Sequence, residues 1–269
     1  LHSTSRRQRQ MCIRDSFEGN PLFNAGIGAT CTVEGTFELD ASIMEGKDLS
    51  AGAVAGLKHV KHPINAAYAV KTKSPHVMLS GAGAEEFAKE QGLEMVEDNM
   101  YFATPKTMEW IEKLKQESKK NGTVGCVVLD KQGNLTAGTS TGGMFKKRWG
   151  RIGDSPVIGA GTYADNNSCA VSCTGHGEYF IRHAVAFDVC ARYKYLKESV
   201  EKAADYIIHT ELNTNAGNGG LIAVDKLGNI AMPYNSGGMF RGFLYKEKGS
   251  PEIKKGCGIG KKIVVVGEK

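Results

Sequence analysis

GTVGCVVLD, residues 122–130, lies near the middle of the 269-residue chain. Thr123 follows a glycine and opens an apolar run that predicts a buried strand. Taken alone, these residues favour an ordinary turn into a sheet. The alternative interpretation is that self-cleavage turns Thr123 into a new N-terminus, which then serves as a nucleophile. The residues that follow this stretch decide between the two interpretations.

Composition places the chain among globular proteins. Its apolar fraction is 41% and its charged fraction is 23%, and we find no uncharged apolar window long enough to span a bilayer. Most of the formal net charge of +5 comes from the arginines of residues 1–16, and the other charges are interspersed along the chain. These features predict neither a membrane nor a nucleic-acid partner.

Residues 1–16 differ in character from the rest of the chain. They lack the apolar segment of a secretory signal, and the run RQRQMCIRDS resembles translated sequencing-adapter sequence. We interpret residues 1–16 as a non-native arm and exclude them from fold reasoning. The alternative is a native disordered arm. In either case the remaining residues are interpreted as one domain.

The seven cysteines are irregularly spaced and predict no disulfide framework or zinc ribbon. Cys169, Cys173 and His176 could be taken for metal ligands. A structural zinc site needs a fourth ligand at suitable spacing, and we find none, so no metal site is predicted there. Free cysteines favour a reducing compartment such as the cytoplasm.

Local signals in the first half predict an apolar strand and then three helices. Residues 51–60 are small and apolar and predict a strand. A helix is predicted to start near Pro63, because proline suits the first helical turn. Another covers residues 84–91 and ends at Gly92. Thr104-Pro105 predicts a third helix start, and that helix continues into a polar tail that reaches Asn121.

The second half contains an internal repeat. Residues 125–134 and 220–229 share an apolar strand followed by Asp-x-x-Gly-Asn, and each predicts a β-hairpin. Between the hairpins, apolar spacing predicts helices over residues 178–192 and 198–209. Strands, then helices, then strands indicate an α+β fold in which two antiparallel sheets pack together.

One serine motif is set aside. Gly138-Thr-Ser-Thr-Gly142 matches the G-x-S-x-G pattern of serine hydrolases, but that pattern requires a following helix. Residues 143–153 show no helical periodicity. Ser140 is therefore not predicted to be a nucleophile.

Two other segments indicate how a small polar molecule could bind. Arg151 and Asp154 are three residues apart after a glycine-rich turn, and together they suit the carboxylate and ammonium of an α-amino acid. The alternative is a surface ion pair. Thr174-Gly-His-Gly-Glu178 precedes a predicted helix, where free backbone N–H groups can bind an oxyanion. His176 has no visible partner and is interpreted as an ordinary side chain.

These segments together resemble the plant-type asparaginase and isoaspartyl peptidase family of N-terminal-nucleophile (Ntn) hydrolases. The resemblance covers nearly all of residues 18–245. The motifs that carry it are Pro21-Leu-Phe-Asn-Ala-Gly26, Gly122-Thr-Val-Gly125, Thr139-Ser-Thr-Gly-Gly143, Gly150-Arg-Ile-Gly-Asp-Ser-Pro156 and Ser172-Cys-Thr-Gly-His-Gly-Glu178.

The resemblance implies an α+β fold of the four-layer αββα sandwich type, made as an inactive precursor. Self-cleavage between Gly122 and Thr123 would give an α chain that covers residues 17–122 and a β chain that covers residues 123–269. The freed α-amino group of Thr123 has an unperturbed pKa of roughly 7.7–8.0. It can therefore serve as the base for its own hydroxyl.

The matching motif positions imply a role for each site residue. The catalytic residues are Thr123 as nucleophile, Thr141 beside it, and Thr174 with the N–H of Gly175 as the oxyanion hole. The substrate-binding residues are Arg151 for the α-carboxylate, Asp154 and the Gly177 carbonyl for the α-ammonium, Gly175, and Asn24 close to the nucleophile.

The implied activity is hydrolysis of isoaspartyl (β-aspartyl) peptides and L-asparagine through a β-aspartyl-enzyme intermediate. No cofactor is expected for catalysis, although the loop from Phe17 to Ile27 resembles one that holds a structural sodium ion. The expected assembly is a homodimer of αβ units. The alternatives are a glycosylasparaginase and an unprocessed, inactive member of the family.

The sequence departs from the family at its start. The family opens with a strand that ends in His-Gly-Gly-Ala-Gly and belongs to the central sheet, and this strand is not found here. We therefore expect the chain as given to expose a sheet edge.

Overall fold

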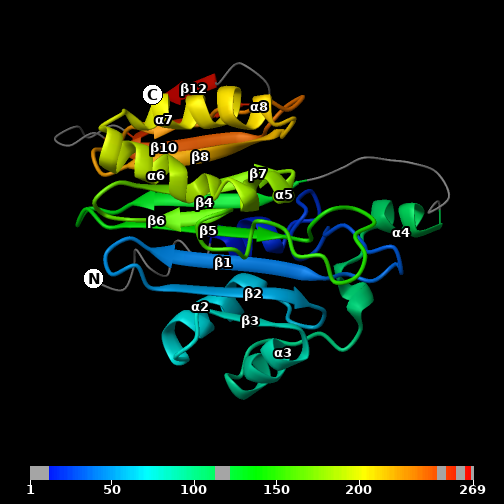
Figure 1. Ribbon diagram of the computed structural model, residues 1–269. Coiled ribbons are helices and arrows are strands. Elements are labelled where there is room, and N and C mark those ends of the chain that lie inside the picture. Colours follow the sequence, from blue (N-terminus) through cyan, green and yellow to red (C-terminus); the bar gives the residue numbers. More distant parts are fainter. Residues whose placement is uncertain (1–11, 113–121, 247–252, 259–263, 268–269) are drawn as a thin grey trace.

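The computed structural model describes residues 12–112, 122–246, 253–258 and 264–267 (Figure 1). Its strands form sheets of five, four and three strands, and helices pack against the first two of these sheets. The predicted α+β class is confirmed. Among the described helices, none has the length and apolar character needed to cross a bilayer.

The five-stranded sheet carries the Gly122-Thr123 segment at its edge. Its strand order is β3-β2-β1-β5-β4, and only the β2–β3 pair is parallel. The strands are β1 (Leu39–Glu45), β2 (Ala51–Leu57), β3 (Met78–Ser80), β4 (Val124–Leu129) and β5 (Leu135–Thr141). Because β4 begins one residue after Thr123, this threonine lies at the start of an edge strand.

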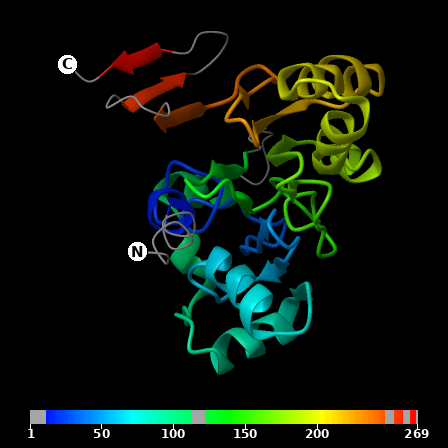
Figure 2. The ribbon, with the colours of Figure 1, turned by 90° about the vertical axis from the view of Figure 1, so that its left-hand side faces the viewer.

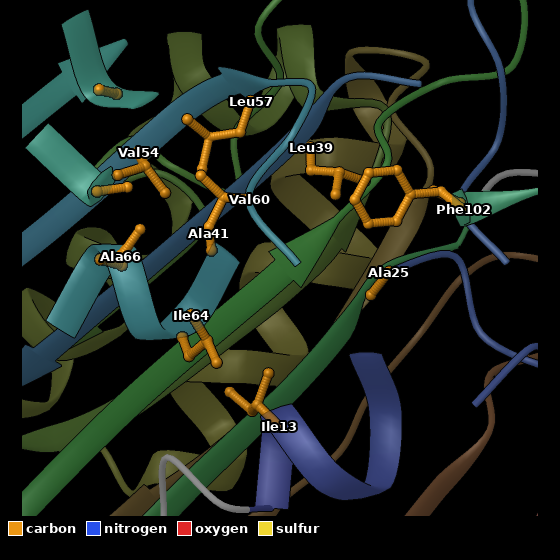
Figure 3. Packing of buried hydrophobic residues seen from close by; sticks show 14 of the residues in the cluster. Ile13, Ala25, Leu39, Ala41, Val54, Leu57, Val60, Ile64, Ala66 and Phe102 are labelled. Atoms are coloured by element: carbon orange, nitrogen blue, oxygen red, sulfur yellow. The ribbon is translucent and has the colours of Figure 1, made fainter. Parts of the chain in front are cut away.

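Helices α2 (Pro63–Lys73) and α3 (Gly81–Glu90) pack on the five-stranded sheet. Figure 3 shows the apolar core that they cover, which includes Val54, Leu57 and Ile64. Proline begins α2 as predicted, and Gly92 follows α3 with φ +68°, a conformation that favours glycine.

The Thr104-Pro105 signal is also confirmed. Helix α4 (Pro105–Glu112) begins at the proline, and the backbone N–H of Thr107 donates to Thr104 Oγ1 at 3.1 Å. This bond satisfies one of the free N–H groups of the first helical turn. The predicted polar tail after this helix falls in residues 113–121, outside the described residues.

The second sheet carries the Thr174-Gly175 segment. Its strand order is β6-β7-β8-β9, and all its strands are antiparallel. They are β6 (Thr162–Ala164), β7 (Cys169–Gly175), β8 (Gly219–Asp225) and β9 (Ile230–Ala231). Helices α6 (Val185–Leu196) and α7 (Val200–Tyr206) pack on it, on the opposite side of the molecule from α2 and α3 (Figure 2).

The prediction of one helix over residues 178–192 is wrong. The chain forms α5 (Gly177–Arg182) and then α6, with a break at Ala184. Ala184 has φ +46° in the left-handed region, and a right-handed helix cannot continue through such a residue. The second predicted helix is confirmed over α7, which runs on into the π-helix η3 (Ile207–Glu211) and the short helix α8 (Leu212–Thr214).

The two large sheets face each other. Strands β4 and β5 pack on β7, and apolar side chains fill the space between the sheets. These buried side chains include Met44, Leu135, Ala164, Ala170 and Val224. The close approach of the sheets brings the start of β4 near the end of β7.

The internal repeat is confirmed as two hairpins, one in each of these sheets. In the first, Asp130 Oδ1 accepts from the Asn134 backbone N–H at 2.8 Å and Oδ2 from the Asn134 side chain at 3.2 Å. In the second, Asp225 makes the same two bonds to Asn229, at 2.9 and 2.7 Å. The aspartate thus closes the turn in each copy.

The remaining elements lie around these layers. They are the π-helix η1 (Cys12–Glu18), the 3₁₀-helix η2 (Asn99–Phe102) and the separate small sheet of β10 (Arg241–Lys246), β11 (Ile253–Gly258) and β12 (Val264–Gly267). Ile13 of η1 is buried in the same core as Ile64 (Figure 3). The domain boundary at residue 16 stays a prediction, although Ile13 on its N-terminal side packs into the core.

Gly125 is expected to be essential to the contact between the sheets. A Cβ at this position would overlap Ser172 Oγ on β7, so we expect Gly125→Ala to destabilise the protein by about 1–3 kcal/mol. Gly83→Ala is the matched control, because a Cβ there meets no atom within 4 Å and alanine favours a helix by about 0.5–1 kcal/mol. Urea denaturation compares the two variants, and equal unfolding midpoints would contradict this account of the contact.

Candidate active site

Thr123 and Thr141 lie side by side because β4 pairs with β5. Val124 is opposite Ser140 in the ladder, so the preceding Thr123 comes next to Thr141. Thr123 Oγ1 donates to Thr141 Oγ1 at 3.3 Å, and Thr141 Oγ1 donates to the carbonyl oxygen of Gly122 at 3.1 Å. The backbone N–H of Gly143 donates to Thr141 Oγ1 at 3.0 Å and fixes the direction of this hydroxyl.

The Gly122 carbonyl oxygen has a second donor. Asn24 Nδ2 donates to it at 2.6 Å and to the Gly143 carbonyl at 2.8 Å. Asn24 is itself held by the Thr30 backbone N–H, which donates to Oδ1 at 2.8 Å. Two fixed donors therefore polarise a carbonyl next to the Thr123 hydroxyl, which is the arrangement that stabilises negative charge on an acyl oxygen.

A small cleft that is partly open to solvent contains this arrangement. It brings together six of the predicted site residues, which are Gly122, Thr123, Thr141, Arg151, Asp154 and Gly175. Asn24 reaches it through Gly122, and Thr174 is half-buried at the end of β7, next to Gly175. The other lining residues were not predicted as site residues; they are Gly143, Met144, Gly153, Ser155 and His176.

Arg151 is held by Glu178, the first acidic residue of α5. Arg151 Nε donates to Glu178 Oε1 at 2.7 Å, and Nη2 donates to Oε2 at 3.0 Å. This two-point contact fixes the plane of the guanidinium and raises the pKa of Arg151. The sequence motifs predict no role for Glu178. It is 27 residues from Arg151 in the sequence, and only the folded turn before α5 brings the two side chains together.

Asp154 is a buried carboxylate whose Oδ2 has no hydrogen-bond partner among the described residues. Burial raises the pKa of Asp154 to about 7, and the nearby Arg151 guanidinium only partly offsets that effect. An unpartnered buried carboxylate in a cleft is costly. A ligand cation would relieve this cost, so the side chain is suited to bind one.

Bare backbone at Gly177 allows these charges to lie close to α5. A Cβ at Gly177 would come within 2.9 Å of Asp154 Oδ1 and 3.0 Å of Arg151 Nη2. At Gly175, a Cβ would overlap the Asn218 carbonyl. Both positions therefore require glycine, which explains the two glycines in the motif Thr174-Gly-His-Gly-Glu178.

Buried hydroxyl groups connect the cleft to both sheets. Ser42 Oγ donates to the Ser155 carbonyl at 2.6 Å and lies 2.8 Å from Thr162 Oγ1. Thr139 on β5 and Ser172 on β7 share a 2.7 Å hydrogen bond. The chain next to Asp154 is thus anchored to the sheet interface and cannot shift freely.

Ser140 lies away from the cleft lining, whereas His176 is part of it. Ser140 lies within β5, where its buried hydroxyl donates to Glu18 Oε1 at 2.7 Å, so the exclusion of a serine nucleophile there is supported by its position. His176 lines the cleft and stacks on Tyr179 with 6.2 Å between ring centroids. Its proximity to the cleft was not predicted.

Comparisons with known proteins identify the family of this chain. Residues 12–253 match the asparaginase family. An isoaspartyl peptidase of Salmonella typhimurium is 50% identical over 85% of this chain and 77% of its own length. An isoaspartyl peptidase of Escherichia coli is 45% identical over 85% and 78%, and a probable isoaspartyl peptidase/L-asparaginase of Arabidopsis thaliana is 43% identical over 87% and 80%. The chain belongs to the asparaginase family, whose members are Ntn-hydrolases.

Proposed function

We propose that this protein is a self-processing threonine hydrolase that cleaves isoaspartyl peptides and L-asparagine. The observation that carries the proposal is one cleft that holds the Thr123 hydroxyl together with Arg151 and Asp154, whose Oδ2 has no partner among the described residues. A nucleophile thus lies within reach of charges that match both ends of an α-amino acid. The names of the curated relatives support the same substrates.

We also propose the four-layer αββα arrangement for the fold. Helices α2 and α3 pack on the five-stranded sheet, that sheet packs on the four-stranded sheet, and α6 and α7 pack on the outer face of the latter. Three separate apolar clusters support this order, because each fills one of the three spaces between neighbouring layers.

In the proposed self-cleavage, Thr123 Oγ attacks the carbonyl carbon of Gly122. The negative charge on the carbonyl oxygen is stabilised by Asn24 Nδ2 and Thr141 Oγ1, which already donate to it. The C–N bond breaks as the nitrogen takes the hydroxyl proton, which leaves an ester and a free amine. Water then hydrolyses the ester and releases the α chain (17–122) from the β chain (123–269).

In the proposed substrate reaction, the free α-amino group takes the proton of Thr123 Oγ, which attacks the β-carbonyl of the substrate. Thr174 and the Gly175 N–H would stabilise the oxyanion. The amine or ammonia leaves with that proton, and water hydrolyses the β-aspartyl ester. Arg151 would bind the α-carboxylate, with Asp154 and the Gly177 carbonyl around the α-ammonium.

The Arg151–Glu178 contact prepares the guanidinium for this role. Nε and Nη2 bind Glu178, whereas Nη1 lies beside Gly153, which lines the cleft. Glu178 therefore leaves one edge of the guanidinium for a substrate carboxylate. Because the plane is already fixed, less side-chain freedom is lost when that carboxylate binds.

Two further features are proposed on narrower support. The carbonyl oxygens of Pro21 and Phe23 both come within 2.7 Å of the point where a Cβ of Gly28 would lie. Such convergent carbonyls suit a hard cation, so the loop from Phe17 to Ile27 can hold a structural sodium ion. We further propose that the αβ units form a homodimer, as the family resemblance implies.

Thr123→Ala is expected to abolish both self-cleavage and hydrolysis, because no hydroxyl remains to attack either carbonyl. A denaturing gel after long incubation, together with an assay of released ammonia, measures both losses. Thr123→Ser keeps a hydroxyl and is expected to retain cleavage at a reduced rate. Fragments that begin at residue 123 in the alanine variant would contradict the proposed nucleophile.

Binding of an α-ammonium is expected to weaken as the pH falls below about 7, the pKa of Asp154. Protonation removes the negative charge that attracts the ammonium, so affinity for L-aspartate should fall by up to about tenfold per pH unit. Calorimetric titration of processed protein measures this, with succinate as a control because it lacks the ammonium. An aspartate affinity that does not change between about pH 5 and 7 would exclude this role for Asp154.

Glu178→Gln is expected to raise KM for L-asparagine by up to about fivefold while kcat changes little, because an exposed ion pair contributes at most about 1 kcal/mol. The matched control is Glu198→Gln, which removes a comparable contact to Arg192 at 2.8 Å outside the cleft. Steady-state kinetics should show the change in KM for position 178 alone. Equal effects of the two substitutions would indicate that Glu178 only stabilises the fold.

A further inference from the structure

We propose that Cys169 and Cys190 form an oxidisable pair that closes a covalent bond between β7 and α6. Their sulfur atoms are 2.9 Å apart, and both side chains are buried. Both are free thiols in this structure. The spacing in the sequence does not reveal the pair, because a strand, a turn and two helical segments separate the two cysteines.

The surrounding contacts hold the two thiols against each other. Cys190 Sγ also lies 3.3 Å from the Cys169 carbonyl oxygen, and Ser168 Oγ donates to the Cys190 carbonyl at 2.7 Å. Helix α6 packs directly on β7. A disulfide bond is about 2.05 Å long, so the sulfurs need to approach each other by less than about 1 Å.

The bond would enclose the part of the chain that carries much of the proposed site. Residues 169–190 include Thr174, Gly175, Gly177 and Glu178, together with the left-handed break at Ala184. A crosslink at the two ends of this segment would restrict its opening. It would thereby stabilise the turn that places backbone N–H groups in the cleft.

The reaction requires an oxidant, and the proposed class is a low-molecular-weight disulfide. The thiolate of one cysteine attacks this disulfide, forms a mixed disulfide and releases one small thiol. The second cysteine then attacks the protein sulfur of the mixed disulfide and releases the other small thiol. The two cysteines together lose two protons and two electrons, and the small disulfide is reduced to two thiols.

Burial makes this exchange slow in the closed protein. Burial raises the pKa of the Cys190 thiol, and the contact with Cys169 raises it further, whereas exchange needs a thiolate. The bond is therefore expected to form during folding or when α6 moves away from β7. Once it is formed, the same burial protects it from reductants.

The bond is expected to stabilise the protein without changing its activity. A closed loop limits the unfolded chain, and this raises Tm by several degrees. The folded geometry changes little because the sulfurs are already in contact. The rate of L-asparagine hydrolysis at moderate temperature should therefore be the same for the oxidised and the reduced protein.

The test is refolding of the full chain in a buffer of oxidised and reduced glutathione, followed by acid quench, alkylation and peptide mapping. We expect a peptide in which Cys169 is linked to Cys190, the loss of two alkylatable thiols, and a rise in Tm that is absent when the protein is unfolded and refolded in a reductant. Complete alkylation of both cysteines after refolding and after prolonged native incubation would overturn the proposal, as would the absence of any shift in Tm when the link is present.

Two variants separate this pair from the other thiols. Cys190→Ala should lose the crosslink and the redox dependence of Tm, and Cys169→Ser should behave in the same way if the first variant folds poorly. Cys173→Ala is the matched control, because Cys173 is also a buried free thiol on β7. It should retain the crosslink. A crosslink that disappears in Cys173→Ala but remains in Cys190→Ala would contradict the assignment.

Discussion

The contact between the two large sheets is the constraint on which the site depends. Gly125 on β4 lies so close to Ser172 on β7 that no side chain fits at residue 125. This approach places Thr123, at the start of β4, in the same cleft as Gly175 at the end of β7. The proposed nucleophile and the proposed oxyanion donor come from different sheets, so their separation is set by sheet packing and not by any one loop.

Charge is arranged around that contact in two different ways. The Arg151 guanidinium is already paired with the Glu178 carboxylate in the absence of a ligand. This pairing holds the guanidinium in a fixed position. Asp154 is buried with Oδ2 unpartnered among the described residues, and its raised pKa records the cost of that burial. The ammonium of a ligand that also carries a carboxylate would supply the counter-charge that the desolvated Asp154 carboxylate lacks.

Much of this arrangement could be predicted from local sequence. Thr104-Pro105 and the Asp-x-x-Gly-Asn turns have a direct chemical cause, which is satisfaction of free backbone groups, and the structure confirms them. The break at Ala184 could not be predicted, because an alanine at φ +46° leaves no compositional signal. The roles of Glu178 and of the Cys169–Cys190 contact were also missed, since both depend on how segments pack against each other.

Acylation of Thr123 Oγ by the substrate is the step on which the proposed hydrolysis depends. Rapid acid quench of processed protein during turnover of L-asparagine, followed by peptide mapping by mass spectrometry, tests it most directly. The account predicts an aspartyl ester on the peptide that begins with Thr123, with fragmentation placing it on that residue. An aspartyl group on any other residue, or turnover by a chain still joined at Gly122-Thr123, would contradict it.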